Sequence, residues 1–353
     1  MNVTMDERAL RFAALFLTVL TVITCAVLRY FPAIHTWEVE VREERLAEEE
    51  YAESQIEMQD FEIREKPEEA VSNGQLSIRL PEGVDSASVK ISYDYVTQTI
   101  EARLPWAGIA YFDSYPVSGS SSYINTLSYA RMGDESVIQI VTDQVYELDT
   151  TYDDGYYYFN FLTPQEVYDK VVVIDAGHGG RAAGATKRGV REKDVNLAIV
   201  LQLQKVFEES DENIGVYFTR TDDSNPTFDQ RVQLANKSHA NLFISIHNNS
   251  TQSGRMSSTQ GTQVMYDETS EASRQFAQIC LEEVTGGLGS RNKGLVEGDS
   301  IYIIRTSEVP VALIEVGFMT NQKELDLLQS EDYQRRTAES VYRAVLRAFE
   351  EGY

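Results

Sequence analysis

The chain has 353 residues, which is enough for two or three domains that each bury a hydrophobic core. Its formal net charge of −25 argues against nucleic-acid binding, because a phosphate backbone would be repelled and no basic stripe offsets this charge. The two cysteines are Cys25 and Cys280, and the first lies in an apolar run. Stability must therefore come from packing rather than from an internal disulfide.

The first predicted element is an uncharged run from Phe12 to Leu28, bounded by Arg11 and Arg29. Its length is just sufficient for a membrane-spanning helix. Two interpretations are open: a cleaved signal peptide, or an uncleaved anchor whose C-terminal side is exported. The anchor is favoured because Thr24-Cys25-Ala26 is a poor cleavage site. We predict a cytoplasmic tail and membrane anchor over residues 1–36, with the rest of the chain outside the cytoplasm.

Residues 37–73 form an acidic segment. Fourteen acidic and four basic residues lie between Glu38 and Ala70. Repulsion among these charges predicts a solvated linker. A coiled coil is not predicted, because the apolar residues recur at every fifth position instead of at a and d spacing.

Short alternating stretches such as "SVKISYDYV" and "SVIQIVT" occupy residues 74–165 and are rich in β-branched and aromatic residues. They predict a small all-β sandwich domain. Its many tyrosines suit either a half-buried sheet or stacking on sugar rings, and the first interpretation is favoured. Because no set of catalytic residues is visible in this domain, we expect its role to be binding or positioning rather than catalysis.

Residues 168–353 alternate between strand and helix patterns, which predicts an α/β domain with a mixed sheet flanked by helices. Val171 to Ile174 is a continuous apolar run, as expected for a strand that is covered on both faces. Ile199, Leu203 and Val206 recur at helical spacing. We expect the chemistry to lie at the carboxyl ends of the strands.

Metal-competent side chains stand where these elements begin or end. His178 follows the strand "VVVIDAG", His247 follows "NLFISI", and Glu192 precedes a helix. Two imidazoles and one carboxylate are a ligand set typical of catalytic zinc. Glu315, within "VALIEVGF", would be a buried carboxylate, which is costly unless it is paired or lies near a cation. Each of these residues alone could have a structural role, and His239, near a helix end, is interpreted as structural. The combination of His178, Glu192, His247 and Glu315 favours a metal site.

Five motifs occur in the order found in one enzyme family, namely "VVVIDAGHGG", "REKDVNLAI", "FTRTDD", "RVQLANKSHANLFISIHNN" and "PVALIEVGFMTNQKEL". The segment from about residue 170 to 350 thus resembles the zinc-dependent N-acetylmuramoyl-L-alanine amidases of the amidase type 3 family. The resemblance implies that His178, Glu192 and His247 bind one Zn²⁺ per catalytic domain and that Glu315 is the catalytic base and acid. It implies cleavage of the amide bond between N-acetylmuramic acid and L-alanine. A bound zinc would lower the pKa of its water to about 7.

Asn248, Asn249 and Arg305 are candidates for contacts with the stem peptide, Arg305 because a guanidinium suits the carboxylates of that peptide. Asp175 either orients an imidazole or closes a turn. The interval between His247 and Glu315 leaves little room for the inhibitory helix that some family members insert there, so we expect an open site. The all-β domain resembles, more faintly, the AMIN module that targets such enzymes to the wall.

Two alternatives keep the fold but change the function: a zinc peptidase of the stem peptide, and a non-catalytic wall-binding protein. The predicted partners are peptidoglycan and, through the N-terminal helix, the membrane, with no nucleic acid. The predicted localisation is the bacterial cell membrane, single-pass, with an extracytoplasmic catalytic domain. No motif identifies a regulatory protein partner or the stage of the cell cycle at which the protein acts.

Overall fold

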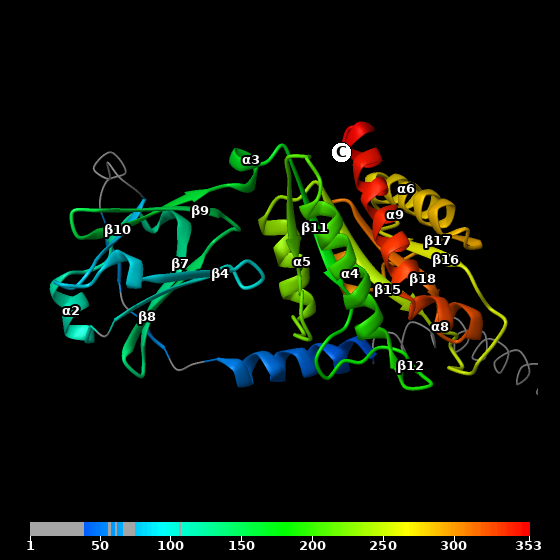
Figure 1. The fold of residues 1–353 in the computed structure, drawn as a ribbon, viewed down its shortest axis with the longest axis horizontal. Helices are drawn as coiled ribbons and strands as arrows, with labels where there is room; N and C mark the ends of the chain where they lie inside the picture. Colours follow the sequence, from blue (N-terminus) through cyan, green and yellow to red (C-terminus); the bar gives the residue numbers. More distant parts are fainter. Residues whose placement is uncertain (1–38, 56–57, 61, 66–74, 106) are drawn as a thin grey trace, which may run out of the picture.

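A computed structural model describes residues 39–55, 58–60, 62–65, 75–105 and 107–353 (Figure 1). An all-β part and an α/β part lie at opposite ends of the molecule. Residues 39–54 form a helix, here called the acidic helix, which runs alongside both parts (Figure 1).

Two five-stranded sheets make up the all-β part. The first has the order β1 (Gln59–Asp60), β7 (Ile124–Met132), β8 (Glu135–Thr142), β5 (Thr99–Pro105) and β4 (Lys90–Asp94). The second has the order β2 (Arg64–Glu65), β6 (Ser118–Gly119), β3 (Leu76–Arg79), β10 (Tyr156–Leu162) and β9 (Glu147–Asp153). The short helices are η2 (Ser86–Ser88), α2 (Ile109–Ser114), η3 (Ser121–Tyr123) and, after β10, α3 (Pro164–Val167).

The core of the all-β part follows the period-2 alternation of its strands. In β5, Ile100, Ala102 and Leu104 are buried while the residues between them are half-buried. Several tyrosines join this core: Tyr123 stacks on Phe161 at a centroid distance of 5.8 Å, and Tyr146 is buried beside the same ring. Tyr123 and Tyr146 therefore pack in the sheet, which is the role that the sequence favoured over stacking on sugar rings.

The α/β part is built on a six-stranded sheet. Its order is β14 (Ile214–Phe218), β11 (Lys170–Ala176), β15 (Leu242–Asn249), β18 (Val311–Phe318), β16 (Thr262–Tyr266) and β17 (Asn292–Glu297). All neighbouring strands are parallel except β16 and β18, so the sheet is mixed, as predicted. A small hairpin, β12 (Thr186–Lys187) with β13 (Val190–Arg191), follows β11.

Helices cover both faces of this sheet, which explains the continuous apolar runs of its strands. The first face is covered by α4 (Glu192–Glu208), α6 (Glu271–Leu288), α8 (Gln322–Leu328) and α9 (Glu331–Glu350). The second face is covered by α5 (Phe228–Lys237) and α7 (Tyr302–Arg305). In β11, Val172 and Ile174 enter the first core and Val171 and Val173 the second. The carboxyl ends of β11, β15 and β18 therefore lie side by side.

The predicted single-pass localisation in the bacterial cell membrane must be corrected. Among the described residues, no helix is both long enough and apolar enough to cross a membrane. The two longest helices of the α/β part, α6 and α9, carry charges along their length, whereas a span needs about 20 mostly apolar residues. The segment 1–36, on which the prediction of an anchor rested, lies outside the described residues.

The predicted solvated linker is wrong for residues 39–54. These residues are helical, and one face of the helix is covered: Glu43 and Ala47 are buried, while Glu40, Glu44 and Glu50 are half-buried. This stripe has the helical period of three to four residues. Because glutamate and alanine form it, a search for apolar periodicity cannot detect it.

Candidate metal and catalytic site

The chain turns sharply where β11 ends. His178 has a φ of +61°, in the left-handed region that residues other than glycine and asparagine rarely occupy. Two contacts hold this turn: the Gly177 N–H donates to the Ile246 carbonyl at 3.1 Å, and Arg231 Nη2 donates to the His178 carbonyl at 3.0 Å. The conformation directs the His178 side chain toward the neighbouring strand ends.

Three side chains meet at this edge of the sheet. His178 Nε2 lies 3.2 Å from Glu192 Oε1, and His247 Nδ1 lies 3.1 Å from the same oxygen. The potential ligand atoms of the three residues all lie within 4.8 Å of one another. The structure therefore brings together the three residues that the sequence nominated as metal ligands.

Glycines allow the chain to approach these side chains closely. A Cβ atom at Gly177 would lie 2.1 Å from His247 Nε2. A Cβ atom at Gly184 would lie 2.6 Å from His178 Cδ2 and 2.7 Å from Glu192 Oε2. Any side chain at either position would displace a candidate ligand.

Glu192 is buried at the first position of α4 and is fixed by backbone amides. Its Oε2 accepts a hydrogen bond from Ala185 N at 2.8 Å, and its Oε1 accepts one from Asn248 N at 3.1 Å. The Asn248 side chain donates to Asn196 Oδ1 at 2.7 Å, and Asn196 donates to the Gly177 carbonyl at 3.0 Å. Asn248 thus links Glu192 to the β11 turn.

Glu315 stands on β18 directly beside His247 in the strand register. Its Oε2 atom is buried and has no hydrogen-bond partner in the described part of the chain. Burial and the nearby charge of Glu192 raise the pKa of Glu315 to about 8. A buried carboxylate oxygen without a partner is costly, and the cost is expected to be offset by a cation or a reacting group.

The charges of the ligand group are strongly coupled. Burial opposes protonation of His178, but Glu192 and Glu43 outweigh it and raise the pKa of that imidazole to about 10. Burial likewise opposes ionisation of Glu192, yet His178 and His247 hold its pKa well below the usual range. The carboxylates of Glu192 and Glu43 therefore favour positive charge at His178.

Asp175 does not bond to an imidazole. Its Oδ1 accepts hydrogen bonds from Thr219 Oγ1 and Arg231 Nη1, both at 2.6 Å, and its Oδ2 accepts one from Ser245 Oγ at 2.5 Å. Although burial raises it, the pKa of Asp175 is lowered to about 2 by the Arg231 charge and these hydroxyls. Since Arg231 also holds the His178 carbonyl, this buried ion pair acts as a scaffold for the turn.

A cavity of about 400 Å³ opens on these groups. Its lining includes the three candidate ligands and Glu315, together with Asn248, Asn249 and, from the acidic helix, Val39, Glu40 and Glu43. Asn249 is half-buried, with Nδ2 donating to Gln263 Oε1 at 3.1 Å. Arg305 does not line the cavity; its Nη1 donates to the Ser300 carbonyl at 2.9 Å and lies 3.4 Å from Glu40 Oε2.

The open site expected from the sequence stays a prediction, and the acidic helix forms one wall of its cavity. Glu43, which the sequence interpretation missed, places its Oε2 3.1 Å from His178 Nδ1. The spacing of Glu40, Glu43, Ala47 and Glu50 puts these residues on one helical face, but their composition does not mark that face as buried.

Known proteins share sequence with the α/β part of the chain. The family model for N-acetylmuramoyl-L-alanine amidase matches residues 172–347. The chain is 36% identical over 183 residues to the uncharacterized protein YqiI of Bacillus subtilis (strain 168), covering 51% of this chain and 85% of that protein. It is 32% identical over 196 residues to the germination-specific N-acetylmuramoyl-L-alanine amidase of the same organism, covering 52% and 81%.

Among solved structures, the catalytic domain of CwlV, an N-acetylmuramoyl-L-alanine amidase from Bacillus (Paenibacillus) polymyxa var. colistinus, is 35% identical. The match covers 51% of this chain and 98% of that domain, with a TM-score of 0.48. By its sequence, the chain belongs to the N-acetylmuramoyl-L-alanine amidase family. It is an enzyme of peptidoglycan, an amidase that separates the stem peptide from N-acetylmuramic acid.

Proposed function

We propose that the chain hydrolyses the amide bond between N-acetylmuramic acid and L-alanine with one zinc ion held by His178, Glu192 and His247 and with Glu315 as general base and acid. The observation that carries this proposal is the buried Glu315 Oε2, which faces the same cavity as the three candidate ligands and lacks a partner among the described residues.

The ligand group fits zinc. Its atom pairs at 3.1 and 3.2 Å are close to the spacing of about 3.3 Å between tetrahedral ligands that lie 2.0–2.1 Å from the metal. Two imidazoles and one carboxylate leave a fourth position for water or substrate, as catalytic sites require. When bound, zinc supplies Lewis acidity toward the scissile carbonyl and the attacking water.

The chain's own groups perform the proton transfers. Glu315 Oε2 takes a proton from the attacking water and then delivers it to the L-alanine nitrogen, since one carboxylate can serve as base and then as acid. Burial and the Glu192 charge raise the pKa of Glu315 to about 8, and with a cation held by the ligands this pKa would be lower, so that the carboxylate would accept a proton at neutral pH. Asn248 N and Ala185 N keep Glu192 oriented throughout.

For the substrate residues, the contacts favour different roles. Asn249 lines the cavity, and we assign it a direct contact with the stem peptide. Asn248 is buried and supports Glu192, so we assign it to the ligand group rather than to the substrate. Arg305 would reach a carboxylate of the peptide only where Glu40 now lies.

We further propose that residues 168–353 form the catalytic domain and that residues 74–165 form an AMIN-like domain that positions it on the wall. Membership in an enzyme family sets aside the non-catalytic alternative. The same membership sets aside the stem-peptide peptidase, although the proposed ligands and base would serve any amide. Mass spectrometry of digested muropeptides separates the two, since an amidase leaves intact stem peptides and bare glycan.

Substitution of Glu315 tests the proposal. Glu315→Ala should retain near-stoichiometric zinc but release no new L-alanine N-termini from purified peptidoglycan. His247→Ala should lose zinc instead. An active Glu315→Ala protein would contradict the assignment.

A further inference from the structure

The acidic helix forms one wall of the cavity at the candidate site. It contains seven glutamates and two arginines in residues 39–54. Glu43 is 9% exposed and shares the cavity with Glu315 and the candidate ligands. The helix therefore covers the site with its carboxylates and not with an apolar face.

Contacts on both sides of Glu43 fix the helix over the site. Glu40 Oε1 accepts a hydrogen bond from Tyr302 N at 2.6 Å, and its Oε2 lies 3.4 Å from Arg305 Nη1. Glu44 Oε2 accepts one from Phe228 N, at the start of α5, at 2.6 Å. The amide at the start of α5 is of the kind that binds anions at helix N-termini.

The far end of the helix is held at the loop after His178. Glu50 Oε1 accepts a hydrogen bond from Arg181 N at 2.7 Å, and Glu53 Oε2 pairs with Arg181 Nη2 at 2.6 Å. A Cβ atom at Gly180 would lie 2.3 Å from Glu50 Oε2, so this glycine gives the carboxylate its room. In addition to Glu43 at His178, four glutamates of the helix, namely Glu40, Glu44, Glu50 and Glu53, thus bind groups of the α/β part.

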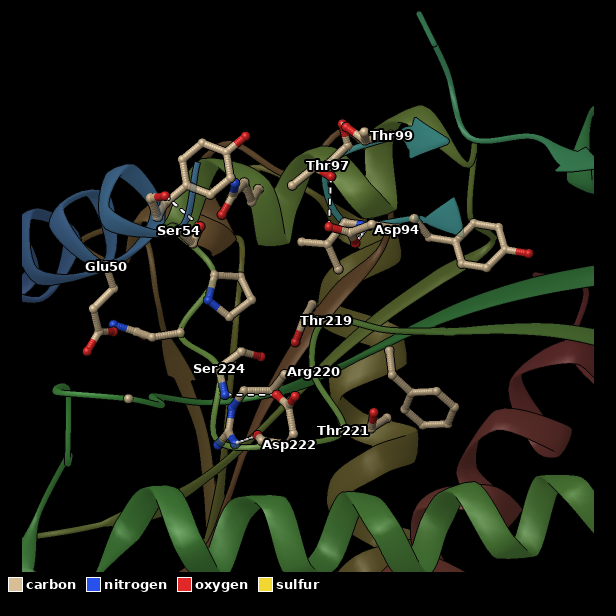
Figure 2. A pocket seen from close by; sticks show the side chains of 18 of the residues that line it. Glu50, Ser54, Asp94, Thr97, Thr99, Thr219, Arg220, Thr221, Asp222 and Ser224 are labelled. Atoms are coloured by element: carbon tan, nitrogen blue, oxygen red, sulfur yellow. Dashed lines mark hydrogen bonds between the residues drawn. The ribbon is translucent and has the colours of Figure 1, made fainter. Parts of the chain in front are cut away.

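Behind this end of the helix, a second cavity of about 770 Å³ opens between Glu50 and Ser54, Asp94 to Thr99, and Thr219 to Ser224 (Figure 2). On the helix, Ala47 is the one apolar residue that is fully buried, Val39 and Leu46 are half-buried, and glutamates make the hydrogen bonds to the α/β part. Segments with few buried apolar contacts open at low free-energy cost. We therefore expect the helix to undock from the α/β part at a low free-energy cost.

We propose, building on the proposed function, that the acidic helix is a substrate mimic that inhibits the enzyme: its carboxylates occupy the positions that carboxylates and carbonyls of the stem peptide must take. Glu43 stands at the metal ligands, Glu40 at Tyr302 N and Arg305, Glu44 at Phe228 N, and Glu50 at Arg181 N. Peptidoglycan enters the cavity only after displacing the helix.

The size of the effect follows from the contacts. A charge-assisted hydrogen bond such as Glu44 to Phe228 N shifts a docking equilibrium by about 10- to 100-fold when it is lost. Because the helix belongs to the same chain, its effective concentration at the site is high, on the order of millimolar. Weakening one contact should thus raise turnover markedly without touching the site.

A matched pair of charge reversals tests the proposal. Glu44→Lys reverses a docked carboxylate, while Glu48→Lys makes the same change one turn later at an exposed position. We expect Glu44→Lys to raise kcat/KM on purified peptidoglycan at least about tenfold and to increase amide hydrogen exchange in residues 39–54. The Glu48→Lys protein should match the wild type in both measurements.

Hydrogen exchange distinguishes a failure of the inhibition proposal from a failure of the amidase proposal, because it measures docking of the helix even in the metal-free protein. Faster exchange in Glu44→Lys without a gain in kcat/KM would overturn the inhibition while leaving the amidase proposal intact. If the double variant Glu40→Lys with Glu44→Lys neither loosens the helix nor gains activity, docking through these contacts is wrong. A failure of the amidase proposal appears separately, as absence of new L-alanine termini with every variant.

Added peptide tests the mimicry itself. A synthetic peptide of residues 39–54 should inhibit the Glu44→Lys enzyme competitively with peptidoglycan, and the same peptide carrying Glu43→Gln should inhibit it less. Inhibition that substrate does not relieve, or equal inhibition by both peptides, would contradict a substrate mimic.

Discussion

The strongest structural prediction concerns Gly177→Ala. The new Cβ would lie 2.1 Å from His247 Nε2 and 2.3 Å from Cε1, whereas ordinary contacts begin at 3.4 Å. The imidazole ring must therefore move by about 1.3 Å, because the Cβ belongs to the backbone of a buried strand end. Ligand positions in metal sites tolerate displacements of only about 0.5 Å. We expect zinc affinity to fall by at least about 100-fold.

The substitution is otherwise mild, since the φ of Gly177 lies outside the range that disfavours alanine. Gly286→Ala is the matched control: it also avoids positive φ, it lies within α6, and its Cβ would meet nothing within 4 Å. That control should keep its zinc and be neutral or slightly stabilised. Titration of both proteins with a zinc-competing chelator, with circular dichroism as a check of folding, measures the difference. A folded Gly177→Ala protein with wild-type zinc affinity would refute the reasoning about close approach.

Further predictions concern the scaffold and the lining. Because folding lowers the pKa of Asp175 to about 2, its ionisation stabilises the fold above about pH 4, by about 2 kcal/mol, and this contribution is lost as the pH falls toward 2. Asp175→Asn should therefore unfold at lower urea at pH 7 and approach the wild type near pH 2; an equal gap at both pH values would contradict the ion pair. Asn248→Ala keeps the backbone N–H that binds Glu192 but removes the side-chain bond to Asn196 that holds this backbone in place, so it should weaken zinc binding about tenfold. Asn249→Ala should keep zinc and raise KM. If both variants behaved alike in chelator titrations and in kinetics, the separate roles would be wrong.

Much of the catalytic part was predictable from the sequence. The continuous apolar runs around Val171 and Ile244 are typical of strands that are buried on both faces. Because neighbouring strands of this kind are parallel, their carboxyl ends lie at one edge of the sheet. His178, His247 and Glu315 therefore met as the positions of their strands predicted. The backbone turn that aims His178, and the scaffold under it, depend on Arg231, whose long side chain carries no periodic signal.

Other features lay beyond sequence reasoning for physical reasons. The polar character of Asn248 suggested a substrate contact, but its burial places it against Glu192 and Asn196. The acidic helix docks through glutamates on backbone amides, so its buried face has the composition of an exposed one. Its charges repel one another in isolation and become favourable only beside the cationic and amide groups of the folded catalytic part.

The central claim is that a metal held by His178, Glu192 and His247 supports cleavage at L-alanine. The most direct measurement is mass spectrometry of peptidoglycan digested by the full chain, by the chain treated with a chelator, and by the treated chain after zinc is restored. The account predicts intact stem peptides with new L-alanine N-termini, their loss with the chelator, and their return with zinc. Undiminished release of these termini by the metal-free protein would contradict it.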